Sequence, residues 1–173
     1  MRSKTLQRLL FLVLMLFVMG GYAHADGPTP AMIIAQIKKG GSEKVVLELT
    51  HNDSRWDAVT ENIQKGDKEW LEVARLLKPG SDAGSSEDLN FSVARALPRN
   101  PVDVLSLIDG AYFEIERVCT IPFIEAERDV EERYLKDVEG ALLNMQGESD
   151  NHKVQTLRWR CLGIVQSLLK SLN

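Results

Sequence analysis

Apolar residues recur every three or four positions through most of this 173-residue chain, which is the spacing of helices with one buried face. The pattern is clearest between residues 54 and 109, where it divides into four short segments. We therefore predict four short amphipathic helices there, with Trp56 and Trp70 on their buried faces. The stops that separate them contain glycine or proline: Gly66, Lys78-Pro79-Gly80, Pro98-Arg99-Asn100-Pro101 and Gly110.

Two further helices are predicted before this region. Thr29 followed by Pro30 is typical of a helix start, and residues 40–41, both glycine, would end that helix. Residues 43–50 are ambiguous, because Val45 and Val46 favour a strand whereas the interleaved Glu and Lys residues favour a helix. We interpret residues 42–51 as a short helix and keep a strand as the alternative.

The turn at residues 51–54 contains a candidate helix cap. Ser54 with Asp57 three residues later has the pattern of a capping box, which satisfies free backbone N–H groups at a helix start. His51, Asp53 and Asp57 could also be read as a metal site, but the paired histidines of a zinc-binding helix are missing. A capping turn explains both carboxylates, so we predict neither a metal site nor a cofactor.

Longer helices are predicted after Pro122. One apolar face repeats from Phe123 to Met145 and another from Val154 to Leu172, with a break at residues 147–151. We expect these two helices to form an antiparallel hairpin against which the short helices pack. The predicted fold class is all-α, with short stacked helix pairs packed on a C-terminal antiparallel helical hairpin, in a single domain of residues 26–173.

The first 25 residues have the composition of a secretory signal peptide, so we expect export to the periplasm. An uncleaved membrane anchor is the alternative, but the apolar run is shorter than the roughly 20 residues that span a bilayer. We therefore expect cleavage after Ala25 and no stable membrane insertion afterwards. The signal consists of a basic start, an apolar run and a small-x-small cleavage site: Arg2, Lys4 and Arg8, then Leu9–Met19, then Ala23-His24-Ala25.

The charge balance argues against a nucleic-acid partner. Without the three basic residues of the signal, 18 of the 21 Lys and Arg remain against 25 Asp and Glu, a formal charge of −7 compared with −4 for the whole chain. Nucleic-acid binding requires clustered Lys and Arg. An acidic surface instead suits a basic protein partner.

The chain has two cysteines, Cys119 and Cys161, and an exported protein with two cysteines usually pairs them. A single straight helix from residue 111 to 145 would hold the sulfurs too far apart, because Cys161 would lie opposite the region of Leu135. We therefore predict a disulfide together with a break in the helix at residues 120–122. Two buried free thiols are the alternative.

Patterns typical of catalysis are missing from the sequence. Residues 84–86 do not form a Gly-x-Ser-x-Gly elbow, there is no glycine-rich phosphate loop, and neither cysteine belongs to a C-x-x-C pair. We predict that the chain is not an enzyme and keep carboxylate catalysis as a third hypothesis. Four carboxylates could supply an acid and a base, but at helical spacing among arginines they are typical of a solvated face: Glu125, Glu127, Glu131 and Glu132.

The predicted partner-binding residues lie mainly in a loop at residues 80–86 and at the start of the next helix, because binding contacts concentrate on loops held by rigid elements. The alternative is a hinge between helix pairs, with Ser85 and Asp88 as helix caps. Trp159 lies off the main apolar face of the last helix, so either another helix or a partner covers it. The full set is Ser81, Asp82, Ser85, Glu87, Asp88 and Trp159.

Four features of this chain together resemble a known class of proteins: the signal, the size, the helix and stop from Trp70-Leu71 to Pro79-Gly80, and the pair of Cys119 and Cys161. The class is that of the small exported all-helical proteins of Gram-negative bacteria, which include immunity proteins that guard the periplasm against injected cell-wall hydrolases. The resemblance implies an inhibitor that fills an enzyme's active site with a loop or a helix face.

We therefore expect a periplasmic binding protein, acting as an inhibitor or immunity protein against a basic envelope-active toxin or cell-wall hydrolase. A structural or assembly factor of the cell envelope is the alternative. A homo-oligomer is compatible with either function.

Overall fold

The computed structural model describes residues 27–145 and 151–172, which form helices and no strands. The predicted all-α class is confirmed. The predicted signal peptide at residues 1–25 lies outside the described residues, as does most of the predicted break at 147–151. In chain order the elements are α2 Pro30–Gly40, α3 Ser42–Thr50, α4 Asp53–Ile63, α5 Lys68–Leu77, the 3₁₀ helix η1 Lys78–Gly80, α6 Ala83–Ala96, α7 Pro101–Leu107, α8 Ile115–Val118, α9 Arg128–Asn144 and α10 His152–Leu172.

Several helix ends follow the local sequence signals. Thr29 caps α2 and Pro30 is its first residue. Asn100 and Pro101 do the same for α7. Gly66 has a φ of 81°, a left-handed conformation that glycine adopts without strain, and it lies in the turn between α4 and α5. These ends were predictable because each depends on residues within one helical turn.

The ambiguous residues 42–50 form α3, so the helix interpretation is confirmed and the strand alternative is wrong. Val45 and Val46 are buried on the face that packs into the fold. The predicted cap of the next helix lies two residues too late in the sequence. α4 begins at Asp53 because Asn52, not Ser54, accepts the backbone N–H of Arg55.

The predicted loop at residues 80–86 is wrong, because η1 ends at Gly80 and α6 begins at Ala83. Asp82 is the N-cap of α6, and its carboxylate accepts the backbone N–H of Ser85 at 2.9 Å. The Ser85 hydroxyl in turn accepts the backbone N–H of Asp82 at 3.0 Å. This reciprocal capping box satisfies two backbone donors and draws the small residues into the helix.

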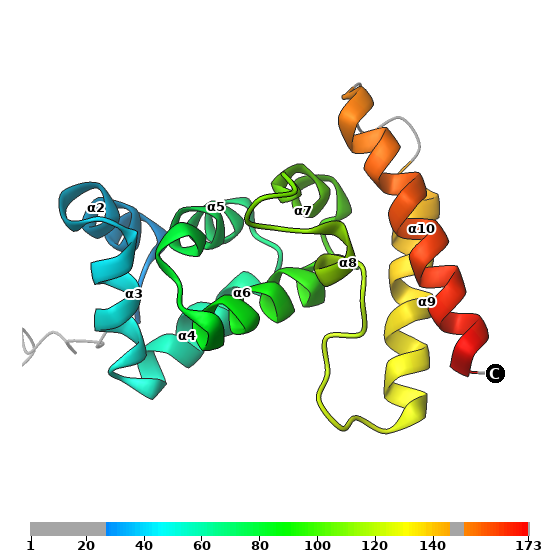
Figure 1. Ribbon diagram of the computed structural model, residues 1–173, viewed down its shortest axis with the longest axis horizontal. Coiled ribbons are helices and arrows are strands. Elements are labelled where there is room, and N and C mark those ends of the chain that lie inside the picture. Colours follow the sequence, from blue (N-terminus) through cyan, green and yellow to red (C-terminus); the bar gives the residue numbers. More distant parts are fainter. Residues whose placement is uncertain (1–26, 146–150, 173) are drawn as a thin grey trace, which may run out of the picture.

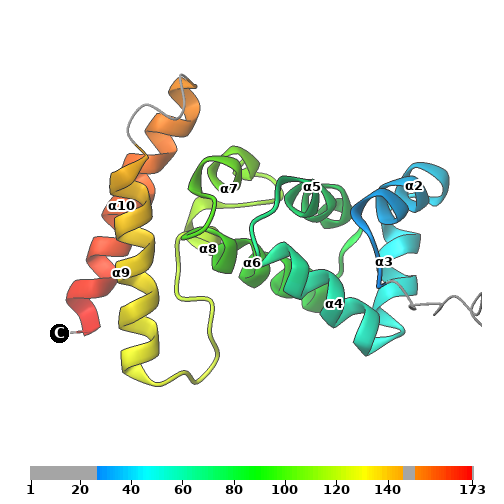
Figure 2. The same cartoon turned by 180° about the vertical axis from the view of Figure 1, so that it is seen from behind.

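The short helices stack beside one another and the last two helices form an antiparallel hairpin at one end (Figure 1). α2 and α3 lie at the opposite end, α4, α5 and α6 occupy the middle, and α7 and α8 adjoin the hairpin. From behind, α9 and α10 again run side by side, and the irregular segment of residues 119–127 leads from α8 to the start of α9 (Figure 2). The predicted architecture is therefore confirmed.

The buried apolar side chains form one continuous cluster that reaches from Ile33 to Val165. Trp56 and Trp70 belong to it, with 7% and 8% of their surface exposed, as predicted. The phenol of Tyr134 ties α9 to this core by donating to a carbonyl of α6. Among the helices of residues 27–145 and 151–172, none is both long enough and apolar enough to span a membrane.

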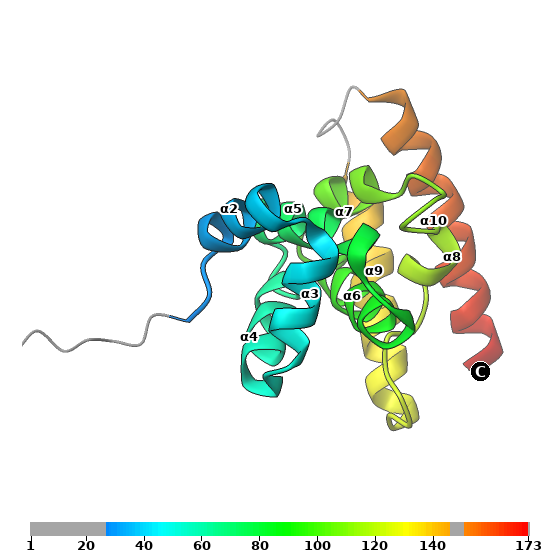
Figure 3. The ribbon, with the colours of Figure 1, turned by 60° about the vertical axis from the view of Figure 1, so that its left-hand side comes forward.

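A disulfide joins Cys119 to Cys161, as predicted, with their Cα atoms 5.4 Å apart. The chain break that this bond requires is also present. It is longer than predicted, since residues 119–127 form no helix and α9 begins only at Arg128. The bond links the residue directly after α8 to α10. Figure 3 shows α8 and α10 close together. A disulfide is consistent with an oxidising compartment outside the cytoplasm.

Arg158 holds the C-terminal hairpin together from inside. This α10 side chain is 5% exposed, and its Nε and Nη2 atoms donate to the carbonyl oxygens of Leu142 and Leu143 at 2.7 and 3.1 Å. Those carbonyls belong to the last turn of α9, where no further helical N–H is available to bond them. The guanidinium therefore satisfies them and also opposes the negative end of the helix dipole.

Candidate functional site

The predicted partner-binding residues do not line one cavity. Asp82, Glu87 and Asp88 line three different cavities around the first turns of α6. Trp159 lies on α10, which is at the hairpin end of the fold (Figure 1). It is 58% exposed, so no neighbouring helix covers it, and the guanidinium of Arg158 lies 4.8 Å from its ring centre.

Ser81 and Ser85 are occupied in building the start of α6. The Ser81 hydroxyl donates to the carbonyl of Lys78 at 2.7 Å, and Ser85 is buried in the capping box. The hydrogen bond from the Ser85 hydroxyl, with those from backbone N–H groups, lowers the pKa of the Asp82 carboxyl. Ser85 thus acts at the helix cap, as the alternative interpretation expected, whereas Asp88 does not.

Asp88 belongs to an acidic cavity of about 320 Å³ between α4, α6 and the irregular segment of residues 119–127. Its Oδ2 atom accepts a hydrogen bond from the indole Nε1 of Trp56 at 2.8 Å. Asp57 and Glu61 line the same cavity from α4, where a spacing of four residues places both on one face. Three carboxylates from two helices therefore meet at one opening, which we call the acidic cavity.

Two apolar side chains also line the acidic cavity. Ile124 is 76% exposed, and Phe91 is half-buried. An exposed apolar side chain next to carboxylates is suited to a lysine or arginine, whose hydrocarbon stem and charged head need both kinds of contact. The sequence signal for this site was Asp57 and Glu61 at helical spacing, but Asp57 had been explained as a cap.

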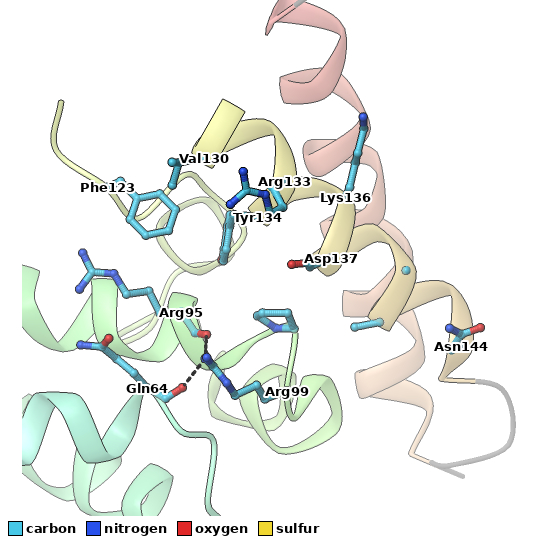
Figure 4. Close-up of a pocket in the computed structure, with 13 residues that line it drawn as sticks. Gln64, Arg95, Arg99, Phe123, Val130, Arg133, Tyr134, Lys136, Asp137 and Asn144 are labelled. Carbon is cyan, nitrogen blue, oxygen red and sulfur yellow. Dashed lines mark hydrogen bonds between the residues drawn. The ribbon is translucent and has the colours of Figure 1, made fainter. Parts of the chain in front are cut away.

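A larger cavity of about 750 Å³ lies between the end of α6, the turn after it and α9 (Figure 4). We call it the basic cavity, because the described residues that line it include four cations and one carboxylate, Asp137. Gln64 and Arg95 also line the acidic cavity, so the two cavities are neighbours. The four cations are Arg95, Arg99, Arg133 and Lys136.

Lys78 is a buried cation that sequence reasoning missed, because a lysine just before Pro-Gly looks like an ordinary basic residue at a helix end. It is 6% exposed, and its Nζ donates to the Ser86 carbonyl, the Ser86 hydroxyl and the Asn90 Oδ1 atom at 2.7, 2.6 and 2.7 Å. All three donors are thus used to tie the end of α5 to α6. Burial lowers the pKa of Lys78 to about 8, and the positive charge of Arg117 acts in the same direction.

This buried lysine predicts a rise in stability at alkaline pH. Because the folded-state pKa of Lys78 is about 8 and the unfolded value is near 10.5, the unfolded chain binds more protons between those values. The wild type should therefore gain stability relative to a Lys78→Met variant as the pH rises. The difference between their free energies of unfolding should change by about 2 kcal/mol in favour of the wild type between about pH 7.5 and 9.5. Urea titrations of both proteins across this range measure the difference. A constant difference would show that the three hydrogen bonds keep Lys78 charged.

The His51 imidazole bonds to its own helix. Its Nδ1 atom donates to the carbonyl of Leu47 at 2.6 Å and so closes α3. Within residues 27–145 and 151–172, no group of three or more His, Cys, Asp or Glu side chains is placed to hold a metal ion.

The chain was also compared with known proteins. No protein-family model matches it, and no curated protein or solved structure is significantly similar to it. Its function must therefore be inferred from the cavities themselves.

Proposed function

We propose that this chain is an exported binding protein that captures a basic protein partner, and that it acts as an inhibitor or immunity protein against an envelope-active toxin or cell-wall hydrolase. The observation that supports this function is the acidic cavity formed by Asp57, Glu61 and Asp88 beside the exposed Ile124. An arginine or lysine side chain of the partner is the group that fits it.

Such a side chain would make two kinds of contact in the cavity. Its stem would pack on Ile124 and Phe91, while its charged head would reach the carboxylates. Hydrogen bonds between a guanidinium and a carboxylate are charge-assisted and often bidentate, so they are stronger than neutral ones. Partial removal from water strengthens the attraction further.

The site is organised before any partner arrives. Asp57 and Glu61 are on α4, Asp88 is on α6, and the bond from Trp56 holds the Asp88 carboxylate in place. Carboxylates on packed helices lose less conformational freedom on binding than carboxylates on a mobile loop, which favours the tight binding that an inhibitor needs. The net negative charge of the chain would also attract a basic partner from a distance.

The test uses the exported protein and its partner. Immobilised on a resin, it should retain a basic protein from a periplasmic extract, and adding it to that protein should inhibit cell-wall hydrolysis. An Asp57→Asn/Glu61→Gln variant should bind the same partner at least about tenfold more weakly, because two charge-assisted contacts are lost.

A Glu48→Gln/Glu116→Gln variant is the matched control, since both side chains are exposed and lie outside the acidic cavity. It changes the net charge by the same amount and should leave the affinity within about twofold. Equal affinity of both variants would reject the acidic cavity as the binding site. Retention of a large envelope assembly without inhibition would instead support a structural or assembly factor.

A further inference from the structure

We propose that the basic cavity binds a small organic anion, namely a carboxylate or phosphate group carried on an apolar or aromatic body. The basic cavity differs in charge from the acidic cavity that would capture a basic partner, although Gln64 and Arg95 line both. Figure 4 shows its two sides, with Arg95 and Arg99 on one and Arg133, Lys136 and Asp137 of α9 on the other.

Arg95 is held in a fixed position without a carboxylate. Its Nε donates to the carbonyl of Pro122 at 3.0 Å, and its guanidinium lies 5.3 Å from the ring centre of Phe123. The side chain is half-buried, so part of its hydration is already lost. In the part of the chain that the structure describes, no carboxylate lies within ion-pair distance of Arg95. The guanidinium therefore keeps donors that an anionic ligand could use.

Arg99 is fixed by backbone groups in a similar way. Its Nη1 atom donates to the carbonyls of Gln64 and Arg95 at 3.0 and 3.1 Å, which are drawn in Figure 4. These carbonyls lie at the ends of α4 and α6, whose dipoles carry only roughly half an elementary charge each. Among the described residues, Arg99 too has no carboxylate within ion-pair distance. A purely structural role as a helix cap needs one of its nitrogens and leaves the others for a ligand.

The cations on α9 are different, because each is paired with a carboxylate one turn away. Arg133 contacts Asp129 at 3.0 Å and Lys136 contacts Glu132, and both cations are exposed. Exposed pairs of this kind are weak, so either cation can turn toward a bound anion. Asp137 repels negative charge on the same side. The anionic group of a ligand is therefore expected at the Arg95 and Arg99 side.

The remaining lining can accommodate an apolar body. Phe123 and Tyr134 meet edge to face with ring centres 5.3 Å apart, and Val130 and Ala141 also line the cavity. The volume of about 750 Å³ lies within the range of small-molecule sites. Fixed arginines at one side and an apolar wall at the other thus specify an amphipathic anion.

Calorimetric titration with three probes tests the site: phenyl phosphate, benzoate and the uncharged benzyl alcohol. Both anions should bind, and the alcohol should not, because the three share a ring and differ in charge. The tighter of the two anions identifies phosphate or carboxylate as the preferred group. Absence of heat with both anions up to about 10 mM would overturn the proposal.

Two variants with opposite expected effects locate the binding. Arg95→Gln/Arg99→Gln should weaken binding of the anions at least tenfold, whereas Asp137→Asn should strengthen it severalfold by removing the repulsive charge. Arg75→Gln is the control, because Arg75 is exposed, paired with Glu72 and outside the cavity. If the double arginine variant fails to fold, an unchanged affinity of Asp137→Asn still overturns the proposal. The acidic-cavity variant Asp57→Asn/Glu61→Gln should weaken capture of the basic partner without weakening the binding of the anions, which separates this site from the proposed function.

Discussion

Removing the disulfide by Cys119→Ala/Cys161→Ala is expected to lower the free energy of unfolding by about 4 kcal/mol. The two residues are 42 positions apart, and linking them restricts the unfolded ensemble far more than the folded one. Urea unfolding of the wild type and the variant measures the loss. The wild type in excess reductant serves as the control and should unfold at the same urea concentration as the variant.

The disulfide should also matter for both cavities. It anchors the irregular segment of residues 119–127, which contributes Ile124 to the acidic cavity and Phe123 to the basic cavity. Loss of the bond should therefore weaken the binding of small anions as well as stability. A variant that loses less than about 1 kcal/mol would mean that Arg95 and Tyr134 hold the segment without the disulfide.

The second large effect is expected from Gly80→Ala, which should destabilise the fold by about 3 kcal/mol. A Cβ atom at this position would lie 2.2 Å from the backbone nitrogen of Glu43 and 2.4 Å from the carbonyl carbon of Ser42. Both atoms belong to the backbone at the start of α3, so no side chain can rotate away and η1 must move. Thermal unfolding followed by circular dichroism measures the loss.

Gly84→Ala is the matched control for this prediction, only four residues along the chain. Its added Cβ would meet nothing closer than an Asp82 Oδ1 atom at 3.9 Å, and the residue is in α6. Replacing a helical glycine in open space should stabilise the protein by roughly 0.5 to 1 kcal/mol. Similar stability of the two variants would mean that η1 can move away from the start of α3 at little cost.

Local signals account for what sequence alone predicted well. Thr29, Asn100 and Gly66 set helix ends because the groups that they satisfy lie within one turn of the same helix. The pairing of Cys119 with Cys161 followed from their number and from expected export, and the break between α8 and α9 followed from the reach of a disulfide. The candidate site was predicted only in part. Asp88 was predicted to bind a partner because of its negative charge, but its position next to Asp57 and Glu61 was not predicted.

Tertiary packing decided the rest. Asp57 and Glu61 meet Asp88, and Lys78 is enclosed by Ser86 and Asn90, only because α4 and α5 pack on α6 at one particular offset and angle. The same apolar stripe on each helix is compatible with several offsets, and each would bring different polar residues together. Periodicity therefore determined which face of each helix is buried. The fit of side chains between helices determined which charged residues share a cavity.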